Sequence, residues 1–288
     1  MQLALGTAQF GLTYGVANSS GQISQQSANE ILELCRLEKI NTLDTAISYG
    51  ESEQCLGLVG VNDFSLITKL PSIPRECKNI NSWVLEEVRT SLLRLKVSSI
   101  YGLMLHQPED LLGNKGPEIL KTLKDLKSKG VVEKIGISVY SPEQLSDIFS
   151  IHVFDIVQCP FNIIDRRLSD SGWLKKLSIL GVEVHVRSCF LQGLLVMPRN
   201  RIPAQFQHWE GLWDIWHEWL EKNNTSSLEA CISFVFSHTG INRLVVGVDS
   251  KLQLMEIILA TQNIDKKKFP NIGSLDDNLI NPSKWKPL

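Results

Sequence analysis

Several common sequence features are missing from this chain of 288 residues. No apolar run approaches the roughly 18–20 residues of a membrane-spanning helix. The N-terminus has neither a basic leader nor a signal-like apolar region. The net charge is −2 and no basic run stands out, so the electrostatic footprint of a nucleic-acid-binding protein is absent. We therefore expect a cytoplasmic protein, a monomer or a small homo-oligomer, that binds neither nucleic acid nor membrane.

The sequence also lacks cysteine spacings that would indicate a metal site or a disulfide framework. Its six cysteines are dispersed, and no two of them have C-x-x-C spacing. We therefore expect no metal, and we expect the cysteines to pack as small apolar side chains. With 43% hydrophobic residues, the chain can build a substantial core.

Short apolar runs alternate with longer amphipathic runs along most of the chain. The pattern predicts strands at 3–7, 41–46, 65–70, 100–105, 135–138, 155–158, 182–188 and 243–247, with helices after them. Eight such repeats at intervals of roughly 30–40 residues are typical of a (β/α)8 TIM barrel of about 250 residues. The alternative is a doubly wound open sheet, which would need a G-x-G-x-x-G fingerprint that this sequence does not contain.

Local signals predict several helix ends. Ser24 is a plausible N-cap for a helix that runs to about residue 39. Asn81 or Ser82 is the predicted cap of the helix after the third strand. A single helix is predicted over 168–180, ended by a glycine.

We expect one domain over residues 1–288. A long loop-and-helix excursion follows the seventh strand at about 190–224, and a polar tail at about 265–288 is expected to wrap the surface. Four tryptophans in the excursion, Trp209, Trp213, Trp216 and Trp219, have helical spacing and form one stripe. The stripe packs the helix on the barrel or, at its start, helps shape the substrate pocket, and the sequence leaves both interpretations open.

Ionisable residues follow three successive strands at the point where each strand ends. Asp44 and Tyr49 follow the second strand, Lys69 lies at the end of the third, and His106 follows the fourth. Because the C-terminal ends of parallel strands meet on one face, we expect these side chains to converge. Each of them alone has an ordinary structural explanation, but four together at successive strand ends favour an active site.

The four residue types suit the reduction of a carbonyl group. An ammonium lowers the pKa of a neighbouring phenol from about 10, and a carboxylate keeps that ammonium charged. A histidine on the far side can hydrogen-bond the substrate carbonyl. The set can protonate an oxygen, but no side chain donates hydride, so a nicotinamide or similar cofactor is required.

The motifs around these residues resemble those of the aldo-keto reductase family. The stretch 44–50, D-T-A-I-S-Y-G, matches the family's D-T-A-x-x-Y-G, and Lys69 and His106 fall at its remaining catalytic positions. I-G-I-S at 135–138 resembles I-G-V-S-N, and V-Q-C-P-F-N at 157–162 resembles V-Q-x-x-Y-N. The resemblance implies an NAD(P)H-dependent reductase of a carbonyl substrate (aldehyde, ketone or sugar-derived). It implies Tyr49 as proton donor, Lys69 and Asp44 as its tuning pair, and His106 as the group that orients the substrate.

The resemblance also implies a set of cofactor contacts, with nicotinamide near Ser138, Gln158 and Arg187 and phosphates near Ser188, Gly193 and Gly247. The full set is Gly6, Thr7, Ser138, Gln158, Arg187, Ser188, Phe190, Gln192, Gly193, Gly247, Lys251, Gln253 and Glu256. Lys251 is the nearest basic group for a 2′-phosphate, with Asp249 opposing it. The resemblance favours NADP(H), and NAD(H) stays open.

The sequence departs from the family pattern at several positions. Val139 stands where the family has an asparagine that contacts the nicotinamide amide, and Ile257 replaces an asparagine near the adenine. Arg187 replaces the aromatic residue that stacks on the nicotinamide. A guanidinium plane can also stack on a ring, or it can reach a substrate anion.

Two broader interpretations remain at this stage. The motif F-L-Q-G-L-L at 190–195 resembles the corresponding stretch of bacterial family members associated with surface-polysaccharide or sugar-nucleotide pathways. This resemblance suggests a role in carbohydrate metabolism. The alternative to an enzyme is a non-catalytic nicotinamide-binding subunit with a redox-sensing or regulatory role, because one fold carries both.

Overall fold

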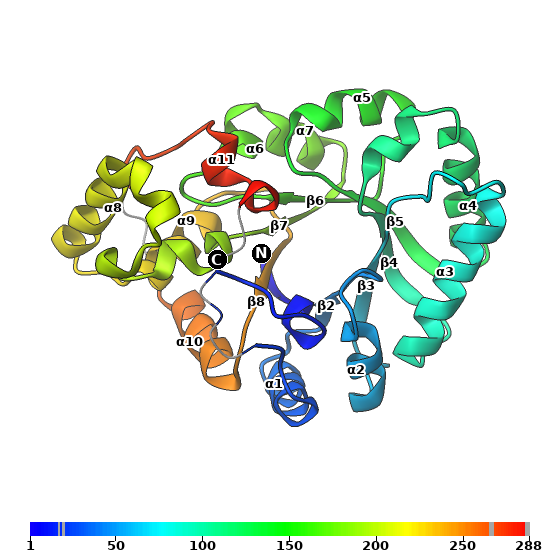
Figure 1. Cartoon of the computed structure of the whole chain (residues 1–288), viewed down its shortest axis with the longest axis horizontal. Coiled ribbons are helices and arrows are strands. Elements are labelled where there is room, and N and C mark those ends of the chain that lie inside the picture. Colours follow the sequence, from blue (N-terminus) through cyan, green and yellow to red (C-terminus); the bar gives the residue numbers. More distant parts are fainter. Residues whose placement is uncertain (17, 19–20, 265–267, 286–288) are drawn as a thin grey trace.

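Eight parallel strands close into a barrel, as the sequence predicts. The computed structural model describes residues 1–16, 18, 21–264 and 268–285. The strands are β1 (Gln2–Gly6), β2 (Thr42–Asp44), β3 (Ser65–Leu70), β4 (Ile100–Leu105), β5 (Val132–Ser138), β6 (Ile156–Pro160), β7 (Glu183–Arg187) and β8 (Arg243–Gly247). Each strand pairs with the next, and β8 pairs with β1, so no edge is left open (Figure 1). The (β/α)8 prediction is confirmed and the open-sheet alternative is wrong.

Helices follow the strands and cover the outside of the barrel. They are α1 (Gln25–Leu37), α2 (Ser52–Val59), α3 (Ile80–Leu95), α4 (Gly116–Ser128), α5 (Glu143–Ile151), α6 (Arg167–Asp170), α7 (Trp173–Ile179), α8 (Glu210–Asn223), α9 (Ser227–Phe236), α10 (Lys251–Gln262) and α11 (Asp277–Ile280). Short 3₁₀ turns are η1 (Ala8–Phe10), η2 (Pro108–Leu112), η3 (Leu191–Val196), η4 (Arg199–Arg201), η5 (Ala204–Trp209) and η6 (Pro282–Lys284). Within the described ranges, no helix is long and apolar enough to cross a membrane.

The predicted helix ends are partly right. Ser24 caps α1 by accepting a hydrogen bond from the Ser27 amide, as predicted. The predicted cap of α3 at 81 or 82 is wrong, because Asn79 has the extended backbone of a cap and accepts from the Ser82 amide. The predicted single helix at 168–180 is divided into α6 and α7, since Gly172 adopts φ 76°, a left-handed conformation that interrupts the helix.

The barrel interior has an apolar middle between two polar ends. Ile67, Met104 and Ile156 form a small buried cluster of their own, separate from the large core between strands and helices. Ile67 lies two residues before Lys69 on β3, and Ile156 two residues before Gln158 on β6, so each pair shares the inner face. The inward side chains therefore become polar toward the C-terminal ends of the strands, where the four predicted catalytic residues lie.

The N-terminal end of the barrel is closed by ionic contacts. The Glu183 carboxylate accepts hydrogen bonds from Tyr101 at 2.7 Å, from Lys134 at 2.5 Å and from Arg243 at 3.1 Å. His185 Nε2 lies 2.7 Å from the same carboxylate. These contacts join β4, β5, β7 and β8, and this end of the barrel serves stability.

The excursion after β7 contains η3, η4, η5 and α8, and its tryptophan stripe packs against the body of the protein. Trp213 and Trp216 are fully buried, and their indole N–H groups donate to the carbonyl oxygens of Phe206 and Leu195. Trp209 instead donates to Asp276 of the C-terminal tail at 3.2 Å. Trp213 and Trp216 thus belong to the buried hydrophobic core, whereas Trp209 ties the excursion to the tail.

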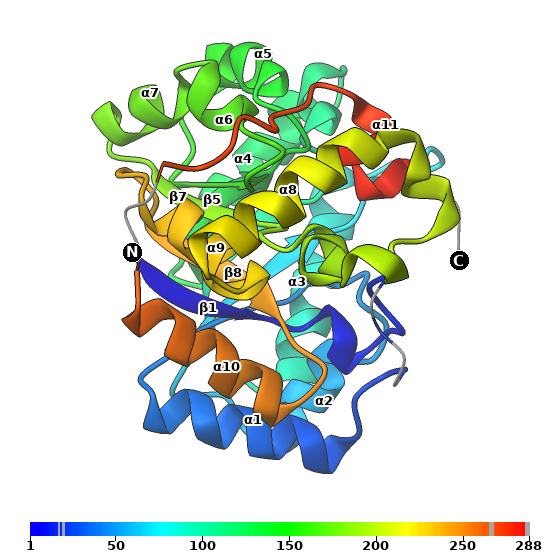
Figure 2. The ribbon, with the colours of Figure 1, turned by 90° about the vertical axis from the view of Figure 1, so that its left-hand side faces the viewer.

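The C-terminal tail does more than wrap the surface. It passes α8 and α6 and brings α11 to the C-terminal ends of the strands (Figure 2). Leu279 and Ile280 are fully buried, and Ser274 N donates to the Ile164 carbonyl at 2.8 Å. The tail is thus part of the face that carries the polar strand ends. Residues 265–267 and 286–288 of the predicted tail lie outside the described residues.

Candidate active site

A buried ion pair lies at the centre of the catalytic face. Lys69 Nζ is 2.6 Å from Asp44 Oδ2, and it also donates to the Thr45 carbonyl at 2.8 Å. The exposed fractions of the two side chains are 0% for Lys69 and 5% for Asp44. The two residues come from the adjacent parallel strands β2 and β3, where Asp44 is paired with Ile67, two residues before Lys69, so the predicted convergence of Asp44 and Lys69 is present.

An amide from the opposite side of the barrel completes this pair. Gln158 Nε2 donates to the second oxygen of Asp44 at 2.7 Å, although the two residues are 114 positions apart. Ser138 Oγ donates to Gln158 Oε1 at 3.4 Å. Gln158 and Ser138 were predicted as cofactor contacts, and here they also connect β5 and β6 to the ion pair.

Tyr49 and His106 lie above the ion pair. The Lys69 ammonium is 5.1 Å from the centre of the Tyr49 ring. The Tyr49 and His106 rings meet edge to face with their centres 5.9 Å apart, and Ser48 Oγ lies 3.3 Å from His106 Nδ1. A side chain at Gly11 would collide with the Tyr49 carbonyl oxygen, so the loop that carries Tyr49 packs directly on the loop after β1. All four residues predicted at the strand ends thus occupy one site.

Burial and charge set the protonation of these groups. Burial, Lys69 and Arg187 together lower the pKa of His106 to about 4, so its ring is neutral at neutral pH. Burial first, and then the Asp44 carboxylate, raise the pKa of Tyr49 above its usual value, while Arg187 acts in the opposite direction. The sequence-based expectation of a phenol acidified by Lys69 is therefore wrong for the protein alone. The physical reason is that the phenol is desolvated and that Asp44 offsets the lysine beside it.

Arg187 at the end of β7 faces the same site. Its Nη2 donates to the Val139 carbonyl at 3.2 Å and its Nη1 to Ser188 Oγ at 3.3 Å. The guanidinium carbon lies 4.8 Å from the centre of the Tyr140 ring. The charge of Arg187 lowers the pKa values of both Tyr49 and His106, which places it within electrostatic reach of the other ionisable groups.

Two tyrosines that the sequence interpretation did not single out also reach the site. Tyr14 comes from the loop after η1, and its hydroxyl accepts a hydrogen bond from Gln192 at 3.2 Å. Tyr14 is 42% exposed, so its desolvation is partial; that desolvation first, and next the neighbouring Tyr49, raise its pKa. Tyr140 follows β5 by two residues and influences the pKa values of both Tyr14 and Tyr49. In the sequence, the one signal for Tyr140 as a site residue is its position just after the end of a predicted strand.

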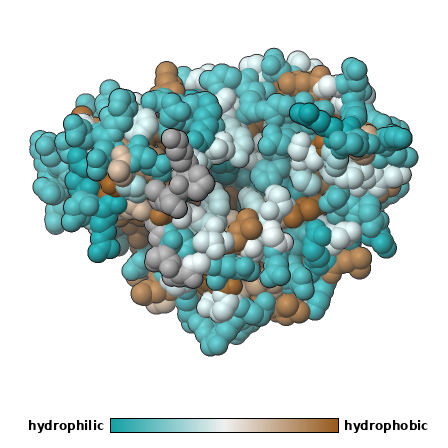
Figure 3. Space-filling model, in the orientation of Figure 1, coloured by the Kyte–Doolittle hydropathy of each residue, from teal (hydrophilic) through white to brown (hydrophobic). Residues whose placement is uncertain are grey.

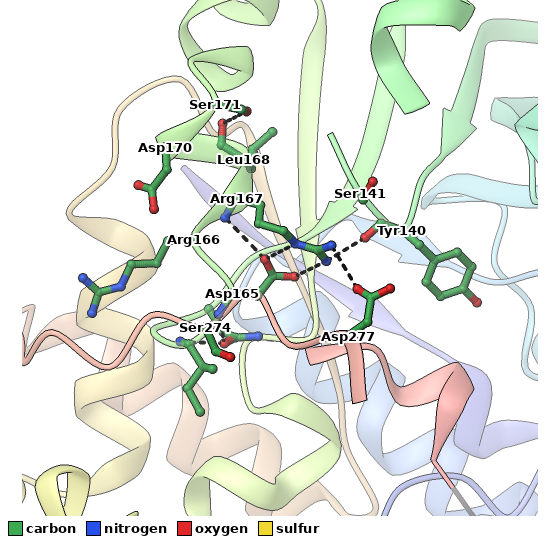
Figure 4. A network of polar contacts seen from close by, with 12 residues as sticks. Tyr140, Ser141, Asp165, Arg166, Arg167, Leu168, Asp170, Ser171, Ser274 and Asp277 are labelled. Atoms are coloured by element: carbon green, nitrogen blue, oxygen red, sulfur yellow. Dashed lines mark hydrogen bonds and ion pairs between the residues drawn. The ribbon is translucent and has the colours of Figure 1, made fainter. Parts of the chain in front are cut away.

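A polar network holds the loop that carries Tyr140 (Figure 4). Arg167 donates to the Tyr140 carbonyl at 3.0 Å, to Asp165 at 2.9 Å and to Asp277 of α11 at 3.3 Å. Arg167 and Asp165 are both largely buried. The network fixes the tail against the loop after β5, and the Tyr140 ring points away from it. Sequence reasoning missed these residues, because none of them lies at a strand end.

The loop after β7 has an unusual backbone. Ser188, Leu191 and Gln192 have φ values of 62°, 48° and 54°, and Gly193 has 92°. Non-glycine residues rarely adopt this left-handed region. Asn162 holds the loop by donating to the Ser188 carbonyl at 3.0 Å. Phe190 is half-buried, and its carbonyl oxygen accepts from the amides of Gly193 and Leu195.

The predicted cofactor positions on β1, β8 and α10 lie at the neighbouring strand ends. Gly247 is exposed, and a Cβ atom there would lie 2.7 Å from the Gln9 amide, so a side chain at this position would displace that amide. Thr7 is fully buried and its hydroxyl donates to the Asp44 carbonyl, beneath the site, while Gly6 lies beside it at the end of β1. Lys251 and Glu256 are exposed on α10.

Gln253 and Asp249 shape the start of α10. Gln253 Oε1 accepts from the Asp249 amide at 2.7 Å, which satisfies a backbone donor ahead of the helix. The Asp249 carboxylate accepts from Asn18 at 3.2 Å, and burial raises its pKa. Lys251 therefore presents its charge to solvent beside a carboxylate that is already hydrogen-bonded.

Cysteines and metal ligands take no part in the site. Cys35, Cys55, Cys159, Cys189 and Cys231 are buried and unpaired, and Cys77 is half-buried. Burial raises the pKa of Cys55 to about 11, which keeps that thiol protonated. Over the ranges that the structure covers, no group of three or more histidine, cysteine or acidic residues could hold a metal ion.

Comparison with known proteins gives consistent results. The chain is 24% identical over 162 residues to the aldo-keto reductase YhdN of Bacillus subtilis, covering 52% of this chain and 48% of that protein. The chain thus spans about half the length of this curated relative. The aldo-keto reductase AKR11C1 from Bacillus halodurans has a similar fold, at 21% identity. In its holo form the TM-score is 0.72, with 91% of this chain and 87% of the other covered. The apo form gives a TM-score of 0.70 at 22% identity, with 83% and 82% covered.

The profile of the Aldo/keto reductase family matches residues 2–277. The match includes every strand of the barrel and all four residues that converge at its C-terminal end. The chain belongs to the aldo/keto reductase family.

Proposed function

We propose that this protein is an NAD(P)H-dependent oxidoreductase that reduces a carbonyl group to an alcohol. The observation that supports it best is the buried pair of Lys69 and Asp44 beneath Tyr49, with His106 beside the Tyr49 ring. A substrate carbonyl above these groups meets a proton donor and a neutral hydrogen-bond donor at the same place. Family membership makes an oxidoreductase of the carbonyl-reducing type the expected class.

Residues around the strand ends fit a nicotinamide cofactor. Ser188, Gly193 and Gly247 lie at or just after the ends of β7 and β8; Gly247 is exposed, and Ser188 and Gly193 have a left-handed backbone. Ser138 and Gln158 would hold the nicotinamide end, and Arg187 would lie beside it. When bound, the cofactor supplies the hydride that no side chain can supply.

The remaining chemistry belongs to the chain's own residues. Tyr49 donates its hydroxyl proton to the carbonyl oxygen as that oxygen gains electrons. Arg187 stabilises the phenolate that forms, which matters because burial alone disfavours it, and the Lys69 ammonium lies 5.1 Å from the centre of the same ring. His106 stays neutral and donates a hydrogen bond that orients the carbonyl. Asp44 keeps Lys69 charged, and Gln158 and Thr45 fix the geometry of the pair.

NADP(H) is the cofactor we favour over NAD(H). Lys251 is exposed at the first residue of α10, and Asn18 already engages the carboxylate of Asp249. The electrostatic repulsion between the Asp249 carboxylate and a 2′-phosphate is therefore weakened. The proposed substrate is an aldehyde, a ketone or a sugar-derived carbonyl compound. A role in carbohydrate metabolism is proposed only on the resemblance of the motif at 190–195 to bacterial family members.

The test is steady-state reduction of a panel of aldehydes and sugars, with each cofactor, by the parent and by Tyr49→Phe. The variant keeps the ring and removes one oxygen. We expect the rate to fall by at least about 10²-fold, the usual worth of general acid catalysis, while cofactor affinity and the unfolding temperature stay close to those of the parent. A variant that reduces its substrate at nearly the parent rate contradicts the assignment of Tyr49. A parent that binds nicotinamide but reduces nothing on the panel favours the non-catalytic sensing subunit.

A further inference from the structure

The charges at the catalytic face do not balance. Lys69 is neutralised by Asp44, and His106 is uncharged at neutral pH. Arg187 has no carboxylate partner among the residues that the structure describes, and its two hydrogen bonds go to a carbonyl and a hydroxyl. The site therefore carries one uncompensated positive charge, which a bound anion would neutralise.

The guanidinium of Arg187 is held in place for such a role. It stacks over the Tyr140 ring at 4.8 Å, and Val139 and Ser188 each accept one of its hydrogen bonds. A guanidinium has five N–H donors in a planar fork, so three remain for a ligand. Two of them suffice for the bidentate binding of a carboxylate or a phosphate.

The surroundings of Arg187 point toward the reacting groups. Glu183, His185 and Arg187 alternate along β7, so Arg187 shares the inner face of the barrel and stands at its open end. Its charge acts on Tyr14, Tyr49 and His106. Figure 3, which shows this face of the molecule, has a recess near its centre with residues of mixed hydropathy around it.

Tyr14 and Tyr140 add neutral hydrogen-bond donors beside this charge. The Tyr14 hydroxyl accepts from Gln192, which leaves its own proton for another acceptor. Arg167 holds the backbone of Tyr140 while the ring points away from that contact (Figure 4). A guanidinium that stacks on one phenol ring and lies within electrostatic reach of a second suits a negatively charged oxygen group better than a neutral one.

We propose that Arg187, assisted by Tyr14 and Tyr140, forms an anion subsite next to Tyr49, and that the substrate is a carbonyl compound that carries a carboxylate or a phosphate. This inference rests on the proposed function and adds the chemical class of the substrate. The subsite determines specificity: it holds the anionic group while Tyr49 and His106 engage the carbonyl oxygen.

Substrate pairs in which one member carries an anionic group and the other does not test the subsite. One pair is 4-formylbenzoate and its neutral isostere 4-formylbenzamide; the other is glyceraldehyde 3-phosphate and glyceraldehyde. The parent should favour the anionic member of at least one pair by about tenfold or more in kcat/KM, the usual worth of a charge-assisted hydrogen bond. The pair that shows the larger preference tells carboxylate from phosphate.

Variants assign the preference to Arg187. In Arg187→Met the ratio of kcat/KM between the anionic and the neutral substrate should fall to about 1. Arg187→Lys keeps the charge but loses the planar pair of N–H donors, so it should retain part of the preference. The ratio within each pair cancels any loss common to both members. Arg199→Met is the control, because Arg199 pairs with Asp214 on the excursion outside the site and its loss should leave the ratio unchanged.

Calorimetric titration of each folded variant with 4-formylbenzoate and with inorganic phosphate gives a readout independent of turnover. Weaker anion binding by Arg187→Met than by Arg199→Met supports the proposal. Equal preference for charged and neutral substrates in the parent overturns it, as does a preference that survives Arg187→Met. A variant that weakens NADPH binding and slows all substrates by the same factor also overturns it and assigns Arg187 to the cofactor. Absence of any carbonyl reduction by the parent is a different result, which counts against the proposed function.

Discussion

The ion pair of Lys69 and Asp44 should be strongly coupled, and a double-mutant cycle can measure that coupling. The changes are Asp44→Asn, Lys69→Met and the two together. Each single change leaves one charge buried without its partner, whereas the double change removes both charges. The free energy of unfolding of the four proteins therefore separates the interaction from the cost of each side chain.

The structure sets the expected size of the effect. The contact is 2.6 Å long, and the side chains are 0% and 5% exposed, so neither charge can be rescued by water. Removing one partner of such a pair typically costs about 3–5 kcal/mol. Lys69→Met still leaves Asp44 the hydrogen bond from Gln158, and Asp44→Asn still leaves Lys69 the Thr45 carbonyl, so each single cost should lie near the lower end of that range.

Asp44→Asn has a second consequence. If the new amide oxygen accepts from Lys69, the amide nitrogen faces Gln158 Nε2, and two donors then oppose each other. Gln158 must rotate its amide and turn its nitrogen toward Ser138 Oγ, which lies 3.4 Å from Gln158 Oε1 in the present arrangement. Turnover should nevertheless fall less than in Lys69→Met, since the asparagine keeps an acceptor for the lysine.

The assay is urea unfolding followed by tryptophan fluorescence and circular dichroism, with the slopes compared among variants. The double variant should cost about as much as one single variant, which corresponds to a coupling of roughly 3 kcal/mol. The exposed helical pair Lys121–Asp125 is the control, with an expected coupling below about 0.5 kcal/mol. The reasoning is refuted if the double variant loses a free energy of unfolding equal, to within about 0.5 kcal/mol, to the sum of the losses in Asp44→Asn and Lys69→Met.

Two further predictions concern pH and the cofactor. Because the pKa of His106 is lowered to about 4, its neutral form is already complete at neutral pH, so kcat/KM should show no inflection from His106 between about pH 5 and 8 and should decline as the pH falls through about 4. The same shift makes stability rise with pH between about 4 and 6.5, since the unfolded chain binds the proton more tightly there; an inflection near 6.5 in kcat/KM that disappears in His106→Gln would contradict the shift. Lys251→Glu should raise the Kd of NADPH by roughly tenfold or less and more than that of NADH, because Lys251 is exposed and partly screened by salt. Fluorescence titration with both cofactors measures the difference, and an equal change in the two Kd values shows that Lys251 does not read the 2′-phosphate.

The sequence by itself determined the order of elements and the position of the four candidate catalytic residues. Strand and helix periodicities are local, so the eight repeats could be predicted before any contact was known. Asp44, Lys69 and His106 come at the ends of successive strands, and neighbouring parallel strands necessarily bring such residues to one face. The short-range errors, at the cap of α3 and at Gly172, arose where several residues could serve as a cap or where a single glycine could continue or end a helix.

The tertiary structure decided everything that depends on distance through space. The hydrogen bond from Gln158 to Asp44 joins residues 114 positions apart, and Tyr14 meets Gln192 across 178 positions. Arg167 joins the loop after β5 to the C-terminal tail, and no periodic pattern marks that contact. Protonation was decided in the same way: the pKa of Tyr49 is raised rather than lowered, because desolvation and the field of Asp44 are properties of the folded site and not of the residue type.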